Sequence, residues 1–180
     1  MSKNLIRKKI LKLRKKINFK NNEFQSEKIL KFIKNIKLKK KAIGCYYPFN
    51  FEVNITQLIE KLQKNNFLVC LPKINKNLNM IFYEYKQNDP LYINNLGIPE
   101  PSNKKKIVPN ILLIPLVAFD KNLNRIGYGG GYYDRFIEKM KKKKIIKIGL
   151  AFSIQKVDLI PINKFDKKLN YIFTEKKLYK

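Results

Sequence analysis

The sequence contains no histidine, and this absence excludes several kinds of catalytic site. A Ser-His-Asp triad, a Cys-His dyad, a histidine-ligated zinc ion and an imidazole general base each need a group that titrates near neutrality or a nitrogen ligand. If the protein is an enzyme, its chemistry must depend on lysine, arginine, tyrosine, carboxylates, backbone amides or a hard metal ion.

Cysteine and long apolar runs are also scarce. Cys45 and Cys70 lie in or beside apolar segments without metal-binding spacing, so we predict two buried free thiols. The longest apolar run, residues 111–119, includes a proline, whereas a membrane-spanning helix needs about 20 apolar residues. The basic N-terminus lacks the apolar stretch of a secretory signal. We therefore predict no transmembrane helix, no membrane partner and a cytoplasmic location.

Acidic residues are few: 13 against 40 lysines and arginines, which gives a net charge of +27. A chain this basic is a candidate for nucleic-acid binding through phosphate contacts. However, only four of the basic residues are arginines, and the lysines are spread over every segment rather than gathered in one region. This distribution favours a solvated lysine surface, and we expect no specific nucleic-acid partner, although nucleic-acid binding stays open as an alternative function.

What the chain does contain is enough apolar surface for a core, since 44% of its 180 residues are hydrophobic. Apolar residues recur at helical spacing in four segments, the first ending near Asn18, with Asn21 or Asn22 as an N-cap for the second. The predicted helices cover residues 5–18, 22–36, 55–64 and 132–140.

Short apolar runs alternate with these helices, and they predict strands at residues 42–47, 67–71, 80–85, 111–116, 145–151 and 171–174. Alternation of strands and helices indicates an α/β fold with a parallel sheet. We predict a single domain of residues 1–180, with a mostly parallel central sheet flanked by helices in a Rossmann-like three-layer arrangement. Turn residues at 91–106 predict an irregular or peripheral stretch.

Residues 119–135 differ from the lysine-rich background, because they hold four of the seven glycines and two of the four arginines. The segment lies between a predicted buried strand and a helix, where open α/β sheets bind ligands. Its glycines allow backbone amides to approach a ligand, and a helix beginning near Gly131 directs free amides outward. Such a loop suits phosphate, although a tight turn without a ligand is an alternative.

Two side chains in this segment extend the phosphate-binding hypothesis. Arg125 offers a forked donor for phosphate oxygens, and Asp134 is a hard oxygen ligand of the kind that magnesium accepts. A helix N-terminal carboxylate is the alternative for Asp134. The segment matches neither the Walker A pattern nor the dinucleotide fingerprint, because Tyr132 follows the glycines where each pattern requires another residue.

From Pro115 to Arg135 the sequence resembles the 5-formyltetrahydrofolate cyclo-ligases, also called 5,10-methenyltetrahydrofolate synthetases. In their signature a strand ends in proline, and Phe-Asp, a short spacer and Arg-hydrophobic-Gly-x-Gly-x-Gly-Tyr-Tyr-Asp follow, all of which stand here. The resemblance extends in order over nearly the whole chain. It includes Lys3 with Arg7 and residues 47–52, 71–73, 97–101, 149–152 and 161–175.

This resemblance implies an ATP- and Mg²⁺-dependent ligase of folate and one-carbon metabolism. In the implied reaction the formyl oxygen of 5-formyltetrahydrofolate takes the γ-phosphoryl group of ATP. Nitrogen 10 then attacks the activated carbon, and loss of phosphate yields 5,10-methenyltetrahydrofolate. The substrate is a small reduced formyl-folate, and the family implies a monomer. An α/β nucleotide-binding module of other specificity is the alternative within the same fold class.

The resemblance also implies roles for individual residues. The implied catalytic residues are Arg125 and Tyr132. The implied ATP contacts are Lys3, Arg7, Arg125, Ile126, Gly127, Tyr128, Gly129, Gly130, Gly131, Tyr132 and Tyr133. The implied folate contacts are Tyr47, Glu52, Tyr128, Gly129, Gly130, Gly131 and Tyr132. The implied magnesium ligands are Asp134 and Asp166, although Asn170 stands where an aspartate is common in the family.

Each of these residues also has a structural interpretation from the sequence alone. Lys3 and Arg7 resemble the many other solvated helix charges, and Glu52 could cap a helix. Tyr132 and Tyr133 could be core aromatics. Asp166 could be a loop carboxylate paired to residue 167 or 168.

Overall fold

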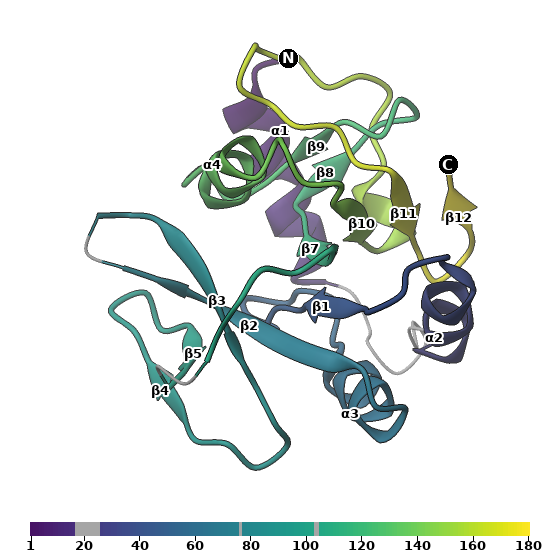
Figure 1. The fold of residues 1–180 in the computed structure, drawn as a ribbon. Helices are drawn as coiled ribbons and strands as arrows, with labels where there is room; N and C mark the ends of the chain where they lie inside the picture. Colours follow the sequence, from purple (N-terminus) through teal and green to yellow (C-terminus); the bar gives the residue numbers. More distant parts are fainter. Residues whose placement is uncertain (17–25, 76, 103–104) are drawn as a thin grey trace.

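The structure is a computed structural model that describes residues 1–16, 26–75, 77–102 and 105–180. A mixed sheet of eight strands forms its centre (Figure 1). Its inner strands, from β11 to β2 in the order below, are parallel, and antiparallel strands complete both edges. In spatial order the strands are β12 (Leu178–Tyr179), β11 (Tyr171–Phe173), β10 (Ile146–Leu150), β7 (Ile111–Pro115), β1 (Ala42–Gly44), β2 (Leu68–Ile74), β3 (Met80–Glu84) and β6 (Lys106–Ile107).

Helices cover both faces of this sheet, because its strands carry apolar side chains on both faces. The central strand β7 is an example. Its alternate side chains point to opposite faces, as the pleat of a strand requires. Ile111 and Leu113 pack with helices α2 (Ser26–Asn35) and α3 (Thr56–Lys64). Leu112 and Ile114 pack in a second cluster with Phe136 of α4 (Tyr132–Lys139). Because both faces are buried, the strand is apolar throughout, and the predicted three-layer α/β architecture is confirmed.

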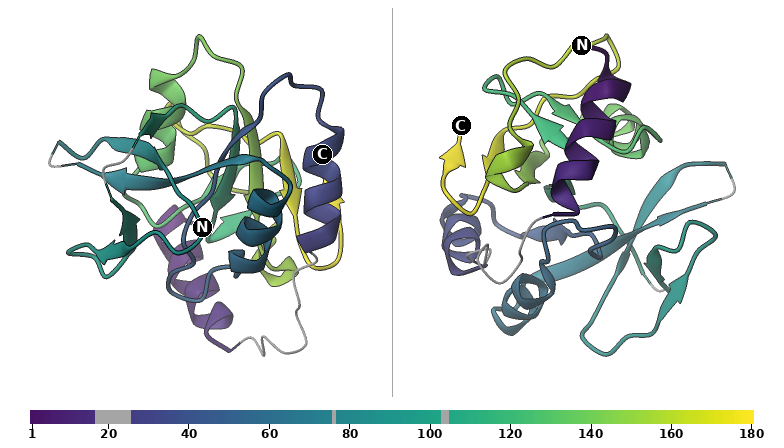
Figure 2. Two further views of the ribbon diagram at one scale, coloured as in Figure 1. Left: turned by 60° about the horizontal axis from the view of Figure 1, so that its bottom comes forward. Right: turned by 180° about the vertical axis from the view of Figure 1, so that it is seen from behind.

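Helix α1 (Lys3–Arg14) packs elsewhere, against the hairpin of β8 (Ala118–Phe119) and β9 (Arg125–Ile126) (Figure 2). Ser2 caps the helix, since its hydroxyl accepts a bond from the amide of Leu5. The hairpin turn is fixed by the fully buried Asp120, whose carboxylate accepts bonds from several backbone amides. The arrangement sets α1 beside the start of the glycine loop, which we define as residues 127–131.

Several element boundaries differ from the sequence predictions. Helix α1 ends at Arg14 rather than near residue 18, and Arg14 is buried whereas the apolar Leu13 beside it is exposed. The predicted N-cap at residue 21 or 22 and the first turn of the second helix lie outside the described residues. Strand β2 continues to Ile74, and the β8–β9 hairpin and β12 were not predicted. The unpredicted strands β8, β9 and β12 are too short to show a clear apolar period.

Residues 91–106 are less irregular than predicted. Strands β4 (Leu91–Ile93) and β5 (Pro99–Pro101) form an antiparallel hairpin, in which two prolines hid the strand pattern. Gly97 takes a φ of 75° in its turn. The hairpin is peripheral, as predicted, because it lies outside the main sheet (Figure 1).

Both cysteines are buried and free, which confirms the thiol prediction. Within the described ranges, no helix has the length and apolar character needed to cross a membrane.

Candidate active site

A cleft of about 1540 Å³ opens beside the carboxyl ends of β1, β2 and β7. Its floor includes residues that follow or end these strands, among them Tyr46, Ile74 and Pro115. The polypeptide leaves a parallel sheet at these ends, so loops from distant parts of the sequence meet there. Helices α1 and α4, the glycine loop, the β4–β5 hairpin and residues 163–167 supply other walls.

Helix α1 contributes two cations to one wall. Lys3 and Arg7 lie four residues apart and so share a helix face. The ammonium group of Lys3 pairs with the carboxylate of Asp166, and Arg7 Nε donates to the carbonyl of Gly127 at 2.8 Å. Asp166 therefore pairs with a residue at the other end of the chain, rather than with its lysine neighbours.

The glycine loop needs backbone conformations that L-residues avoid. Gly129 has a φ of 111° and Gly131, which immediately precedes helix α4, a φ of 64°. Arg135 of helix α4 holds the loop by donating to the carbonyl of Gly130 at 2.8 Å. It also donates to the carbonyl of Leu78 at 3.1 Å and stacks on the ring of Tyr132. The loop is thus anchored on both sides of its turn.

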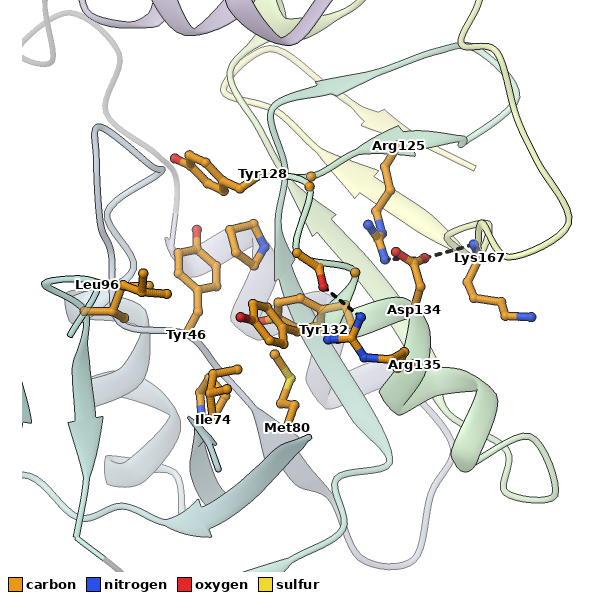
Figure 3. Close-up of a pocket in the computed structure, with 18 of the residues that line it drawn as sticks. Tyr46, Ile74, Met80, Leu96, Arg125, Tyr128, Tyr132, Asp134, Arg135 and Lys167 are labelled. Carbon is orange, nitrogen blue, oxygen red and sulfur yellow. Dashed lines mark hydrogen bonds and ion pairs between the residues drawn. The ribbon is translucent and has the colours of Figure 1, made fainter. Parts of the chain in front are cut away.

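Arg125 and Asp134 form a mostly buried ion pair at one end of the cleft (Figure 3). Arg125 Nη2 lies 2.8 Å from Asp134 Oδ1, which also accepts the amide of Lys167 at 3.1 Å. The Arg125 side chain is only 5% exposed, and its Nε has no hydrogen-bond partner among the described residues. Its Nη1, which lies beside Gly127 and donates to none of the described residues, keeps donor capacity next to the glycine loop.

Glu52 lies in a different wall, in the turn that follows the β1 strand. It is 9% exposed, and its carboxylate accepts the amide of Phe49 at 3.0 Å. Burial raises the pKa of Glu52 to about 7, although the bond from Phe49 and the charge of Arg14 act in the opposite direction. The carboxyl group therefore changes its charge near neutral pH.

Tyrosines near Glu52 stay protonated. Burial raises the pKa of Tyr128 to about 12, and the nearby Glu52 carboxylate adds to this effect. The same two causes hold the pKa of Tyr133 well above its usual value. Both phenols are therefore hydrogen-bond donors in this cleft at neutral pH, not bases.

The wall beyond Glu52 is mostly apolar. Figure 3 shows Tyr46, Ile74, Met80 and Leu96 grouped at the end of the cleft away from Arg125 and Asp134. The buried carboxylate of Glu100 fixes this wall, because it accepts the amide of Ile74 at 3.0 Å and the side-chain amide of residue 94 at 2.8 Å. One end of the cleft is thus charged and the other is suited to a flat apolar ligand.

The structure brings nearly all of the sequence-predicted site residues to this cleft. Ile126 is the exception: its side chain is buried against helix α1, and it does not line the cleft. The predicted residues that line it are Lys3, Arg7, Tyr47, Glu52, Arg125, Gly127, Tyr128, Gly129, Gly130, Gly131, Tyr132, Tyr133, Asp134 and Asp166.

Two contributions were missed. The β4–β5 hairpin lines the cleft, and its residues gave no chemical signal because they are mainly apolar. Arg14 is the largest fully buried side chain among the described residues, and it contacts both the glycine loop and the turn before Glu52. Its spacing from Lys3 and Arg7, which places all three on one helix face, could have revealed it.

The fold and the cleft together define an α/β protein with a candidate small-molecule site at the carboxyl ends of its parallel strands. Residues 1–175 match the model of the 5-formyltetrahydrofolate cyclo-ligase family. The chain therefore belongs to the 5-formyltetrahydrofolate cyclo-ligase family and is an enzyme with that activity in folate metabolism.

Curated relatives and solved structures agree with this assignment. The 5-formyltetrahydrofolate cyclo-ligase of Haemophilus influenzae is 37% identical over 70% of this chain and 71% of its own length. The Escherichia coli cyclo-ligase is 30% identical over 77% and 80%. The NMR structure of the 5,10-methenyltetrahydrofolate synthetase of Aquifex aeolicus has a TM-score of 0.81 and 30% identity, and covers 99% of this chain and 92% of that one. The Mycoplasma pneumoniae synthetase has a TM-score of 0.77 and 27% identity, with 97% and 99% covered.

Proposed function

We propose that the enzyme uses ATP to convert 5-formyltetrahydrofolate to 5,10-methenyltetrahydrofolate. The formyl oxygen attacks the γ-phosphorus, and the bond from that phosphorus to the bridging oxygen of ADP breaks. Nitrogen 10 then attacks the formyl carbon and loses its proton. The C–O bond breaks, so that phosphate leaves with the former formyl oxygen and the new ring carries the positive charge.

The cleft itself is the observation that carries this proposal. Its volume of about 1540 Å³ exceeds the 300–1,000 Å³ of an ordinary single-ligand pocket. One end presents cations and a glycine loop, and the other presents apolar side chains and one buried carboxyl group. Two chemically different ligands, one anionic and one flat and mostly apolar, therefore fit side by side.

In this proposal the charged end holds the triphosphate. Lys3 and Arg7 neutralise phosphate oxygens from α1, and the backbone amides of Gly129 to Gly131 donate to them. Arg125 has a forked guanidinium with unused donor capacity, so it stabilises the charge on the phosphoryl group during transfer. Tyr132 packs over Gly130 at the junction of the two ends and shields the transfer from water.

The apolar end holds the pterin. The carboxylate of Glu52 accepts hydrogen bonds from the amino-substituted edge of the ring, and Tyr47 borders the ring from the adjoining segment. Because a protonated carboxyl group loses one of its acceptor sites, folate binding should strengthen as pH rises through about 7. Phosphorylation makes the formyl oxygen a leaving group, so the reaction needs no histidine to protonate it.

Magnesium fits the donors at the charged end. Asp134 and Asp166 each accept their hydrogen bonds through one carboxylate oxygen, and the other oxygen has no partner among the described residues. No cluster of three or more metal-binding side chains occurs in the described part of the chain. These two carboxylate oxygens would hold Mg²⁺, and a bound ion would neutralise phosphate charge at this end of the cleft.

The experiment that tests this function follows the near-ultraviolet absorbance of the methenyl product in the purified protein. We expect the absorbance to rise only with ATP and 5-formyltetrahydrofolate together, with one ADP per product, and to fall when magnesium is chelated. Asp134→Asn should slow the reaction, whereas Asp158→Asn, which removes an exposed carboxylate outside the cleft, should not. ADP release without product, or product formation without ATP, would contradict the proposal.

A further inference from the structure

Arg14 carries a buried charge that the proposed reaction does not use. Its side chain is 1% exposed, at the last turn of α1. Of the described carboxylates, none pairs directly with it, and its Nε has no hydrogen-bond partner within the same residues. Burying a guanidinium in this way costs free energy, so a simple packing role does not account for an arginine here.

The contacts of Arg14 join three separate segments. Nη1 donates to the carbonyl of Leu116, just after β7, at 3.4 Å. Nη2 donates to the carbonyl of Asn50 at 2.6 Å and to the hydroxyl of Tyr128 in the glycine loop. The Tyr128 hydroxyl itself lies 3.3 Å from the carbonyl of Asn50 and can donate to it. Arg14, the turn before Glu52 and the glycine loop thus form one closed triangle of hydrogen bonds.

The turn that Arg14 holds is conformationally strained. Asn50 and Phe51 have φ values of 48° and 59°, a region that a bulky aromatic residue rarely adopts. Such a turn persists only where its surroundings fix it, and the bond from Arg14 to Asn50 does so. The next residue is Glu52, whose carboxylate accepts the amide of Phe49 across the same turn, so its position depends on how the turn is held.

We propose that Arg14 is a positioning residue that couples the two ends of the cleft, so that a nucleotide in the glycine loop favours folate binding beside Glu52, and the reverse. This inference rests on the proposed function, because it assigns one ligand to each end. A ligand that fixes Tyr128 also fixes the carbonyl of Asn50 through the triangle. Coupling of this kind is reciprocal by thermodynamic necessity.

Arg14 also influences the charge of Glu52. The titratable groups around Glu52 are Arg14 from α1, Tyr46 after β1, Tyr128 from the glycine loop and Tyr133 from α4. Of these, only Arg14 is a cation, and its charge lowers the pKa of Glu52, whereas burial raises it. Loss of that cation therefore moves the deprotonation of Glu52, and with it folate binding, to higher pH.

The test measures the affinity of the protein for a non-hydrolysable ATP analogue by calorimetry, with and without saturating 5-formyltetrahydrofolate. In the wild type we expect the folate to tighten nucleotide binding by about tenfold, within the usual range for coupled sites. Tyr128→Phe keeps the ring beside the guanidinium but removes the shared hydroxyl, and Arg14→Met removes the hub itself. Both should reduce the ratio of the two affinities to near one. Lys12→Met, an exposed substitution on the same helix, should keep the wild-type ratio.

A second readout separates coupling from simple damage to the fold. In Arg14→Met the midpoint of folate binding against pH should move upward, and in Lys12→Met it should not. Should Arg14→Met fail to fold, the half-exposed Tyr128→Phe still tests the coupling. A wild-type ratio of one, or an unchanged ratio in folded Tyr128→Phe, would overturn this inference while ATP-dependent methenyl formation continued. Failure of the proposed function would instead abolish methenyl formation in the wild type.

Discussion

Replacing Glu52 with glutamine removes a buried carboxyl group whose ionisation opposes folding. Glutamine has nearly the same shape, and its side-chain oxygen can still accept the amide of Phe49. Unlike the carboxyl group, it stays neutral at every pH. The variant therefore isolates the free energy of placing a negative charge at this position.

The size of this effect on the free energy of unfolding follows from the pKa of Glu52, which burial raises from 4.5 to about 7. At about 1.4 kcal/mol per tenfold change, this corresponds to about 3 kcal/mol of lost stability once the group is ionised in both states. The folded chain holds the proton up to about pH 7, whereas the unfolded chain releases it near pH 4.5. The contribution of Glu52 to stability therefore falls as pH rises through this window and is lowest above it.

The effect is measured by urea unfolding. Because the chain contains no tryptophan to report on unfolding by its fluorescence, far-ultraviolet circular dichroism follows the transition. Glu52→Gln should exceed the wild type in stability at pH 8.5, and its advantage should grow by about 2–3 kcal/mol between pH 5 and pH 8.5. In a chain of this size, that increase in the free energy of unfolding corresponds to a rise of about 5–10 °C in Tm. Glu60→Gln, in helix α3 away from the cleft, controls for the loss of a carboxylate. An advantage that does not change with pH would refute the reasoning, and the variant should also lose folate affinity.

Three further predictions concern the charged end and the core. Arg125→Ala should lower turnover by more than about tenfold, over 1.4 kcal/mol of transition-state stabilisation, and steady-state kinetics with a thermal melt would show whether stability alone explains the loss. Gly129→Val should abolish nucleotide binding in calorimetry, because a β-branched residue is strained at a φ of 111° and the loop would have to rearrange beside Arg7; normal binding would remove the loop from the nucleotide site. Burial raises the pKa of both cysteine thiols far above the usual value, so a disulfide reagent should modify them only as the protein unfolds, and rapid modification of the native protein would contradict their burial.

The long, strongly patterned elements could be predicted from the sequence. Strand β7 is a continuous apolar run and α3 has clear helical spacing, so both were located to within a residue or two. The β4–β5 hairpin could not be predicted in this way, because Pro99 and Pro101 lie within β5, and β5 also contacts strand β2, which is distant in the sequence. Its stability depends on tertiary contacts such as that between Glu100 and the amide of Ile74.

The candidate site was predictable where residue type alone indicated chemistry. Glycines and arginines in residues 125–135 identified the charged end, and the family resemblance added Glu52 from a distant segment. Arg14 was harder to find because its helix is full of basic residues. Its spacing places it on the helix face of Lys3 and Arg7, but burial is what separates it from its solvated neighbours. The strain at Phe51 was equally invisible, since it arises from contacts that the chain makes only after folding.

Arg135 donates both to Gly130 in the glycine loop and to Leu78 at the tip of the β2–β3 hairpin, so it links the loop to that hairpin. Leu78 is 58% exposed and does not line the cleft, so a dye attached at this position reaches solvent without blocking either ligand. Any rearrangement of the loop must stretch or release that link. The hairpin tip is therefore a natural place for an optical sensor that would follow turnover from outside the catalytic chamber.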